Sequence, residues 1–390
     1  MLIAAARRVG LAATRQGCAL STGRCSIPLL YEDLKDGETN VSALKDIVLG
    51  VLEARGETVD RSLLEFSIVS GGITNKLFKC EAPNTSYTVR VYGGEGMINR
   101  EVETETFIAL ADAKVGKEYI GEFGNGRVEG WIGNADALVL EDMARPEIFR
   151  LTAQELAKLH RMKMPPKLAE HYGEPSLWSQ LHSWLDQAQS SVHLIGEKWG
   201  PATASRFDRI HNLYLGSTDA NGRWTMDRVE KELVYLESTI PRDLSPAVFA
   251  HNDLLAGNIL LNKVTGAVHL IDFEYGGMNY RGFDIANHWN EWAGGTQTEM
   301  NGKCEYERFP TPGAQYAFCE AYLSEENGNV PPEIDTVMSL MEESNKFVLL
   351  NHWFWGLWAV NQVVLEGTED FDYLTYTESR AEQYFKTKEA

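Results

Sequence analysis

Three residues within the stretch "HNDLLAGNILLNKVTGAVHLIDFEY", residues 251–275, could do chemistry together: Asp253, Asn258 and Asp272. The two apolar runs of this stretch are typical of strands, and residues 262–266 between them are typical of a turn, so the sequence predicts a hairpin. A hairpin places the loop before its first strand beside the end of its second strand, which brings Asp253 and Asn258 close to Asp272. Carboxylate and amide oxygens suit a hard cation, and Mg²⁺ is usually held by a few such groups together with substrate phosphates.

The spacing of these residues is that of a phosphoryl-transfer site. His251, Asp253 and Asn258 follow the H-x-D-x-x-x-x-N pattern of a protein-kinase catalytic loop, and Asp272 stands where kinases carry the Asp of D-F-G. Phosphoryl transfer depends on alignment and charge neutralisation more than on covalent chemistry. Asp253 can accept the hydrogen bond of an attacking hydroxyl, while Asn258 and Asp272 can hold metal ions that bridge phosphates. Each residue alone is more often a cap or turn former, but together they predict a kinase-type site.

Composition narrows what such a site can serve. A chain of 390 residues with 44% hydrophobic content can bury a substantial core, and its length favours two or three lobes. The net charge of −20 opposes a nucleic-acid or anionic-membrane partner and is compatible with a cationic ligand. The five cysteines form no C-x-x-C pair, so we expect a reducing compartment with neither a disulfide framework nor a zinc site.

Residues 347–365, "FVLLNHWFWGLWAVNQVVL", are the only candidate for a membrane span. They include two asparagines, a histidine and a glutamine, which are costly to place in hydrocarbon. The sequence therefore predicts a buried helix here and no stable membrane insertion.

The first 31 residues contain four arginines and no acidic residue. This composition resembles a mitochondrial transit peptide, and a disordered cytosolic tail is the alternative. We expect a cytoplasmic protein, or a mitochondrial one if residues 1–31 are a targeting segment. The sequence leaves a homodimer open.

The rest of the chain is predicted to have a β-rich part followed by a mainly helical part. A helix is predicted at residues 41–54. The next predicted elements are strands at 64–70, 75–81 and 87–92, a helix at 99–111, and strands at 128–132 and 137–140. From residue 146 the pattern is mainly helical apart from the hairpin. We expect an α+β fold of two lobes, residues 32–132 and 133–390, and small ligands often bind where such parts meet.

The amino-terminal part offers candidate phosphate contacts. "SGGITNK" is a glycine-bearing turn between strands, and its main chain can approach phosphates closely. The candidate contacts in this turn are Ser70, Gly71, Gly72, Ile73, Thr74, Asn75 and Lys76. Arg90 on the next strand has the position of the kinase lysine that grips phosphates, and Glu103 on the following helix could pair with it. A plain hairpin turn, a surface arginine and a solvated glutamate are the alternatives.

The block "FAHNDLLAGNILL…LIDFEYGGMNYRGFDIANHWNEWAG" closely resembles the choline/ethanolamine kinase family. The segments "SGGITNKLFKC", "VRVYG", "LAKLHRMKMP" and "NKFVLLNHWFWGLWAV" extend the resemblance over roughly residues 60–385. It implies a protein-kinase-like, two-lobed fold and transfer of phosphate from ATP to a small amino alcohol with Mg²⁺. Residues 1–31 and about 170–230 contribute nothing to it.

The resemblance also implies roles for single residues. Asp253 corresponds to the catalytic base, Asn258 and Asp272 to the metal ligands, and Arg90 with residues 70–76 to the nucleotide phosphate contacts. The hinge against which adenine lies corresponds to Gly130, Trp131 and Ile132.

Four further polar residues are expected to be structural. His251 would brace the catalytic loop, and Asp284 would anchor the main chain of that loop. His160 and His288 are expected to be hydrogen-bonded core histidines rather than catalysts.

An amino alcohol needs a pocket for its ammonium group, which aromatic faces and a carboxylate can supply. Trp355 and Trp358 are neighbours on one face of a predicted helix. The resemblance adds Glu291 and the segment "DFDYLTY" with Phe371. Without the resemblance, an aromatic stripe on an apolar helix is more typical of a core. The candidate substrate-binding residues are Asp253, Glu291, Trp355, Trp358, Tyr373 and Tyr376.

The identity of the amine depends on finer features. A primary ammonium donates three hydrogen bonds and favours carboxylates, whereas a trimethylammonium donates none and favours additional aromatic surface. "HNDLLAGN" is similar to ethanolamine kinases, while choline kinases are closer to "HNDCQEGN" and carry further aromatics where this chain has "WAGGTQ". These features favour ethanolamine as the substrate, and the resemblance implies that the product is phosphoethanolamine for phospholipid synthesis. A choline kinase or a dual choline/ethanolamine kinase is the alternative.

Three other interpretations explain the motifs less well. An aminoglycoside phosphotransferase would share the catalytic loop but would not explain Trp355 and Trp358. A protein kinase would need an activation segment, and "GGMNYRGFDIANHW" follows almost directly after Asp272. A pseudokinase scaffold would not need Asp253, Asn258, Asp272 and Arg90 together.

Overall fold

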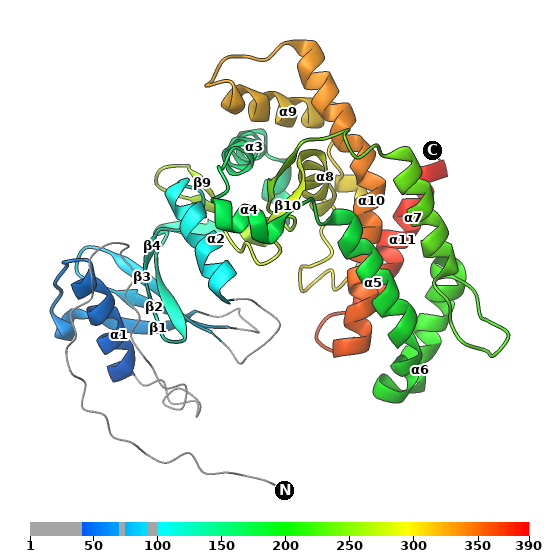
Figure 1. The fold of residues 1–390 in the computed structure, drawn as a ribbon, viewed down its shortest axis with the longest axis horizontal. Helices are drawn as coiled ribbons and strands as arrows, with labels where there is room; N and C mark the ends of the chain where they lie inside the picture. Colours follow the sequence, from blue (N-terminus) through cyan, green and yellow to red (C-terminus); the bar gives the residue numbers. More distant parts are fainter. Residues whose placement is uncertain (1–40, 70–74, 93–99, 390) are drawn as a thin grey trace, which may run out of the picture. The chain divides into compact units, whose positions relative to one another are not determined.

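The structure is a computed structural model in which the described residues form two compact units. The residues that it describes are 41–69, 75–92 and 100–389. The first unit contains the described residues up to Tyr92 together with Glu118–Trp131, and the second contains residues 100–117 and 132–389. Figure 1 shows a sheet with the helix at residues 41–54 in the first unit and mainly helices in the second. This is the α+β composition that the sequence predicts.

A five-stranded antiparallel sheet in the order β1-β2-β3-β5-β4 makes up most of the first unit. Its strands are β1 (Glu65–Val69), β2 (Asn75–Glu81), β3 (Ser86–Tyr92), β4 (Tyr119–Phe123) and β5 (Gly126–Gly130). The first three were predicted to within one residue at each end. β4 was not predicted, and β5 begins and ends two residues before the predicted strand.

The helix α1 (Val41–Ala54) packs on this sheet through one apolar face. Its buried residues recur at intervals of three and four, which is the spacing of one helix face. Gly121 of β4 allows a close approach, because a Cβ at this position would lie 2.6 Å from Cγ1 of Val51. A side chain at position 121 would therefore require Val51 or the helix that carries it to shift.

The central strand β3 fixes the direction of Arg90. Side chains alternate along a strand, so Val89 and Val91, which are buried in the core, lie on one face and Arg90 on the other. The register of β3 and β5 places Arg90 opposite Arg127.

The second unit is built mainly from helices. These are α2 (Arg100–Asp112), α3 (Pro146–His160), α4 (Pro166–Tyr172), α5 (Leu177–Ser191), α6 (Ile195–Ile210), α7 (Asp227–Thr239), α8 (Arg281–Glu291), α9 (Pro312–Glu326), α10 (Ile334–Glu366) and α11 (Tyr373–Glu389). The expected amino lobe would include α2, which groups here with the second unit. The lobe boundary at residue 132 stays a prediction.

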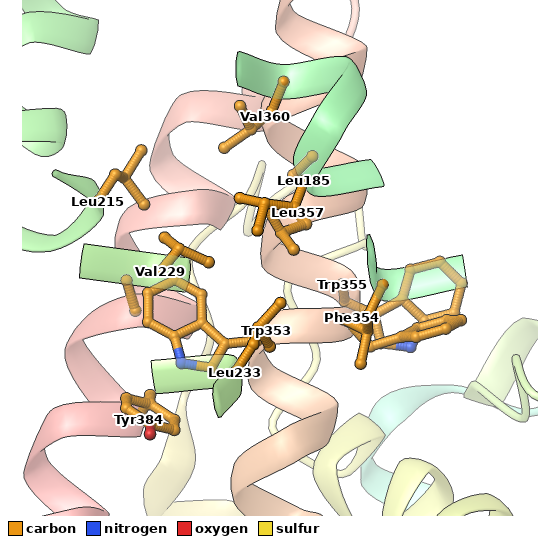
Figure 2. Packing of buried hydrophobic residues seen from close by; sticks show 14 of the residues in the cluster. Leu185, Leu215, Val229, Leu233, Trp353, Phe354, Trp355, Leu357, Val360 and Tyr384 are labelled. Atoms are coloured by element: carbon orange, nitrogen blue, oxygen red, sulfur yellow. The ribbon is translucent and has the colours of Figure 1, made fainter. Parts of the chain in front are cut away.

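The long helix α10 is the centre of the second unit. Its 33 residues span about 50 Å and contact α5, α8, α9 and α11. Figure 2 shows Trp353, Leu357 and Val360 of this helix packed among side chains from the neighbouring helices. The apolar segment 347–365 is thus a core segment of α10. No helix among the described residues is long and apolar enough to cross a membrane.

Two small sheets lie beside these helices and carry the predicted hairpin. The first pairs β6 (Ala135–Ala137), β8 (Ile259–Asn262) and β9 (Val268–Leu270), and the second pairs β7 (Ala247–Ala250) with β10 (Gly277–Tyr280). Antiparallel pairing of β8 with β9 confirms the hairpin. Its turn is closed by Asn262, whose side-chain oxygen accepts the main-chain N–H groups of Val264 and Thr265.

The strand predicted at residues 137–140 is wrong. β6 ends at Ala137, and Leu140–Ala144 form a 3-10 helix. The cause is Asp142, whose carboxylate accepts the main-chain N–H of Val139 at 3.2 Å and so favours a helical turn over an extended chain.

Candidate active site

The loop between β7 and β8 holds Asp253 and Asn258 against each other. The Asn258 side-chain nitrogen donates to the main-chain oxygen of Asp253 at 2.8 Å and to its carboxylate oxygen Oδ2 at 3.1 Å. A main-chain oxygen can only accept, so the amide nitrogen must face Asp253. The carbonyl oxygen of the Asn258 side chain is therefore the atom left for another ligand.

Asp272 follows the hairpin and is held beside this loop. The main-chain N–H of Ile271 donates to the main-chain oxygen of Asn258 at 3.0 Å, which joins the end of the hairpin to the loop. Asp272 has a φ of 61°, a left-handed conformation that aspartate adopts more readily than most residues. Its carboxylate is exposed and accepts no hydrogen bond within the described part of the chain. The structure thus brings together the three residues of the motif.

Burial and the surrounding carboxylates raise the pKa of Asp253. Burial is the largest cause, and the charges of Glu291, Asp272 and Glu274 add to it, so the pKa of Asp253 lies well above its ordinary value. This arrangement attracts cations, because a positive group among these carboxylates would relieve their repulsion.

The donor set fits Mg²⁺. No three His, Cys, Asp or Glu residues in the described chain are grouped so that they could hold a metal by themselves. Asn258 and Asp272 instead offer one amide oxygen and one carboxylate. Mg²⁺ is usually bound by one or two protein oxygens together with waters and substrate phosphates. The metal-binding role of the two residues stays a prediction.

Asp284 of α8 anchors the catalytic loop. Its two carboxylate oxygens accept the main-chain N–H groups of His251 and Asn252, each at 2.7 Å, and one of them also contacts His160 Nε2 at 3.0 Å. Burial alone would raise the pKa of Asp284, but these partners outweigh it and the pKa is lowered. The predicted anchoring role is confirmed.

The histidines near the loop have structural partners, as predicted. His251 Nε2 bonds to the main-chain oxygen of Ile271 at 2.9 Å, so this ring braces the loop against the hairpin. His160 lies between Asp284 and the hydroxyl of Tyr322. His288 Nδ1 donates to the main-chain oxygen of Leu254 at 2.9 Å, and burial lowers its pKa to about 4, so the ring is neutral at pH 7.

In the first unit, Arg90 has an acidic partner that the sequence analysis missed. Its Nε lies 2.9 Å from the carboxylate of Glu129, which also accepts Nε of Arg127 at 2.8 Å. Glu129 is fully buried on β5. A pairing of Arg90 with Glu103 would join the two units and stays a prediction. The pairing of Arg90 with Arg127 places Glu129, two residues further along β5, on the same face of the sheet. The sequence analysis could not use this pairing because it did not place β5 correctly.

The predicted nucleotide contacts are distributed along the same sheet. Asn75 and Lys76 begin β2, whereas Ser70, Gly71, Gly72, Ile73 and Thr74 lie outside the described residues. Gly130 is the last residue of β5. The main-chain N–H of Trp131 donates to the main-chain oxygen of Ser86 at 3.2 Å. Trp131 is the last residue of the first unit and Ile132 begins the next part of the second. The contact of these residues with adenine stays a prediction.

The predicted aromatic residues come together in the second unit. The ring centroids of Trp355 and Trp358 are 5.4 Å apart. The centroid of the Trp358 ring lies 5.5 Å from that of Tyr373 and 6.5 Å from that of Tyr376. The centroid of the Phe371 ring lies 4.9 Å from that of Tyr373 and 5.9 Å from that of Tyr376. The contacts are mostly edge to face, the geometry that aromatic pairs prefer.

Tyr275 joins this group and was missed from the sequence. Its ring lies 5.3 Å from that of Trp355, and its hydroxyl accepts the indole N–H of Trp358 at 3.1 Å. Tyr275 is three residues after Asp272, so it links the aromatic group to the metal-binding motif. That nearness in sequence was the available signal.

Glu291 is the last residue of α8 and is paired with a buried arginine. Oε1 of Glu291 forms an ion pair with Arg380 of α11, which is also fully buried. Burial raises the pKa of Glu291, and the Arg380 guanidinium opposes that rise. The sequence analysis missed Arg380. Its position four residues after Tyr376 was the only local signal.

Comparison with known proteins decides the family. The model of the family described as "Choline/ethanolamine kinase" matches residues 66–385. The chain belongs to the choline/ethanolamine kinase family. It is 35% identical over 339 residues to a probable ethanolamine kinase of Arabidopsis thaliana, covering 85% of this chain and 81% of that one. It is 33% identical to human ethanolamine kinase 2, covering 81% and 74%.

A solved structure supports the same conclusion. An ethanolamine kinase of Plasmodium vivax matches with a TM-score of 0.65 and 26% identity, over 90% of this chain and 91% of that one. The resemblance found in the sequence and the protein-kinase-like α+β fold are confirmed. This choline/ethanolamine kinase family member is accordingly a kinase.

Proposed function

We propose that the protein transfers the γ-phosphate of ATP to the hydroxyl of ethanolamine and so makes phosphoethanolamine for phospholipid synthesis. The observation that carries the proposal is the Asp253–Asn258 pair held beside Asp272 by the anchored loop. The ethanolamine kinases among the similar proteins support the substrate. Ethanolamine is a small amino alcohol whose ammonium group suits a site rich in carboxylates.

Asp253 orients the attacking hydroxyl. Its carboxylate accepts the hydroxyl hydrogen bond and takes the proton while the oxygen forms a bond to the γ-phosphorus and the bond to the ADP oxygen breaks. Phosphoryl transfer needs the attacking and leaving groups in line, so the rigid attachment of the loop to Asp284 serves the reaction. The products are phosphoethanolamine and ADP.

Asn258 and Asp272 are the residues that would hold Mg²⁺. When bound, the ion neutralises charge on the phosphates and orients them. Asn258 offers its side-chain oxygen because its nitrogen is committed to Asp253. In the first unit, Arg90, Lys76 and the turn at 70–76 would bind the nucleotide phosphates, and Gly130, Trp131 and Ile132 would border adenine.

Glu291 and the aromatic group would bind the ammonium group. A primary ammonium donates three hydrogen bonds, and Glu291 can accept one of them. The faces of Trp355, Trp358 and Tyr373 would attract the positive charge, each by about 0.5–2 kcal/mol. The same aromatic group supports choline as a second substrate, because a trimethylammonium depends on ring faces alone.

The place of action is proposed from composition. The low cysteine content supports a kinase in a reducing compartment such as the cytoplasm. A mitochondrial location remains the alternative if residues 1–31 act as a transit peptide, and a homodimer remains open.

The deciding experiment compares kcat/KM for ethanolamine, its mono- and dimethylated forms and choline at saturating ATP and Mg²⁺. We expect ethanolamine to be the best substrate and choline to be slower. A preference for choline would show that choline is the main substrate and would leave the proposed mechanism unchanged. If none of the four compounds is phosphorylated, the proposed function is wrong.

A further inference from the structure

Arg380 is a buried cation with more contacts than its ion pair with Glu291. It donates to the hydroxyl of Tyr376 at 2.6 Å and to the side-chain oxygen of Asn351 at 3.3 Å. Its Nε has no hydrogen-bond partner among the described residues. A buried guanidinium is costly, and apolar residues in its place are often as stable. Stability alone therefore does not explain this arginine.

The contacts of Arg380 extend to Trp355. The side chain of Asn351 donates to Asn287 at 2.9 Å, and the same oxygen of Asn287 accepts the indole N–H of Trp355 at 2.7 Å. Arg380 is thus joined to Trp355 through two buried amides. The network runs from the carboxylate of the proposed ammonium site to its aromatic wall.

Each of three helices contributes two residues to this network, and the two are always four positions apart. α8 supplies Asn287 and Glu291, α10 supplies Asn351 and Trp355, and α11 supplies Tyr376 and Arg380. Residues four apart lie on the same face of a helix. The three helix faces therefore meet around Arg380, and all six residues are buried.

Arg380 leaves one oxygen of Glu291 available. It binds Oε1, and Oε2 accepts no hydrogen bond from the described residues. The charge of Glu291 is felt at Asp253, so the proposed ammonium site and the proposed base are close to each other.

We propose that Arg380 is a positioning residue for the ammonium site. It holds Glu291 by direct contact and Trp355 through Asn351 and Asn287, in the arrangement that receives the ammonium group of the amino alcohol. This inference rests on the proposed function. Without the guanidinium, Glu291 would be buried near other carboxylates with no compensating charge, and would turn away or take up a proton.

The test separates binding of the amino alcohol from the other steps. The contact between ammonium and Glu291 is made in the ground state and in the transition state alike, so its loss raises KM with little change in kcat. In Arg380→Met we expect KM for the amino alcohol to rise about 10–100-fold, while KM for ATP and kcat change less than about threefold.

Arg380→Lys is the second variant, for the case in which Arg380→Met does not fold. Lysine keeps the charge but cannot contact Glu291, Tyr376 and Asn351 as a fork. We expect a selective rise in KM for the amino alcohol that is smaller than in the methionine variant, about three- to tenfold. An unchanged KM in this variant, or a rise in KM for ATP of the same size, overturns the positioning role.

Arg281→Met is the matched control. Arg281 forms a partly buried ion pair between α8 and α10, with its Nη2 2.6 Å from Glu343. It lies at the first residue of α8, ten positions and about 15 Å from Glu291. We expect this variant to lose thermal stability with KM for the amino alcohol changed less than twofold. A rise equal to that of Arg380→Met would show a general packing effect and overturn the inference.

The wild-type assay keeps the two proposals separate. A wild type that phosphorylates neither ethanolamine nor choline refutes the proposed function. A wild type that is active, with Arg380 variants whose KM for the accepted amino alcohol is normal, refutes the positioning role alone.

Discussion

The side-chain amide of Asn258 donates to two oxygen atoms of Asp253, the main-chain oxygen at 2.8 Å and the carboxylate oxygen at 3.1 Å. The proposed base and a proposed metal ligand therefore hold each other in place. This relationship explains why the motif keeps a carboxamide and not a second carboxylate at position 258, since only the amide can both donate to Asp253 and offer an oxygen to a cation.

Replacement of Asn258 should affect metal use as well as rate. In Asn258→Ala we expect kcat to fall about 10²-fold or more and the Mg²⁺ concentration for half-maximal rate to rise, because a ligand and a brace of the base are both lost. Initial rates measured against Mg²⁺ test this. Asn262→Ala is the control, because Asn262 closes the nearby turn and should leave the Mg²⁺ dependence unchanged.

Removal of Asp253 should separate activity from stability. We expect Asp253→Ala to lower kcat by about 10²–10⁴-fold. Its unfolding temperature should equal or exceed that of the wild type, because a carboxylate crowded by Glu291, Asp272 and Glu274 is lost. Steady-state kinetics and thermal unfolding measure the two effects. Activity near that of the wild type would exclude Asp253 as the base.

Asp284 should be needed for folding of the catalytic loop. Asp284→Ala leaves two main-chain N–H groups and His160 without their buried acceptor, so we expect a loss of about 3–5 kcal/mol in the free energy of unfolding. Urea unfolding measures it. Asp219→Ala is the matched control for Asp284→Ala. Asp219 also accepts hydrogen bonds from two main-chain N–H groups, but it lies in a surface turn. Its loss should cost much less, because water can reach the N–H groups that are left without an acceptor.

His288 should make the fold sensitive to acid. Its folded-state pKa is about 4 against an ordinary 6.5, so between these values the unfolded chain binds a proton that the folded chain does not. The stabilising effect is complete above about pH 6.5 and is lost as the pH falls towards 4, by about 3 kcal/mol. The unfolding free energy of His288→Gln should therefore depend less on pH in this window. His193→Gln is the control, because His193 is exposed.

The catalytic motif was predictable because its parts are close in sequence. Asp253, Asn258 and Asp272 fall within 20 residues, and the turn at 262–266 was a local signal that brings their segments together. α1 was predicted with its observed bounds because its apolar residues follow one helix face. These features depend on local patterns, which a sequence displays directly.

The missed features depend on contacts between distant segments. Arg380 and Glu291 are 89 positions apart, and nothing in either local sequence indicates that the two are paired. Glu129 lies beside Arg90 because β3 pairs with β5, and the strand predicted for β5 was displaced by two residues. Network residues such as Asn287 and Asn351 look like ordinary polar residues on apolar helices until the helices are packed.

The aromatic group should matter more for choline than for ethanolamine. In Trp358→Leu we expect kcat/KM for choline to fall about 3–30-fold further than kcat/KM for ethanolamine, because a trimethylammonium has no N–H groups for Glu291 and depends on ring faces. Trp353→Leu is the control on the same helix. Trp353 packs against Tyr384 in the core, so its loss should lower the unfolding temperature without changing the ratio of the two substrates. Equal losses for both substrates in Trp358→Leu would show that this ring only fills space.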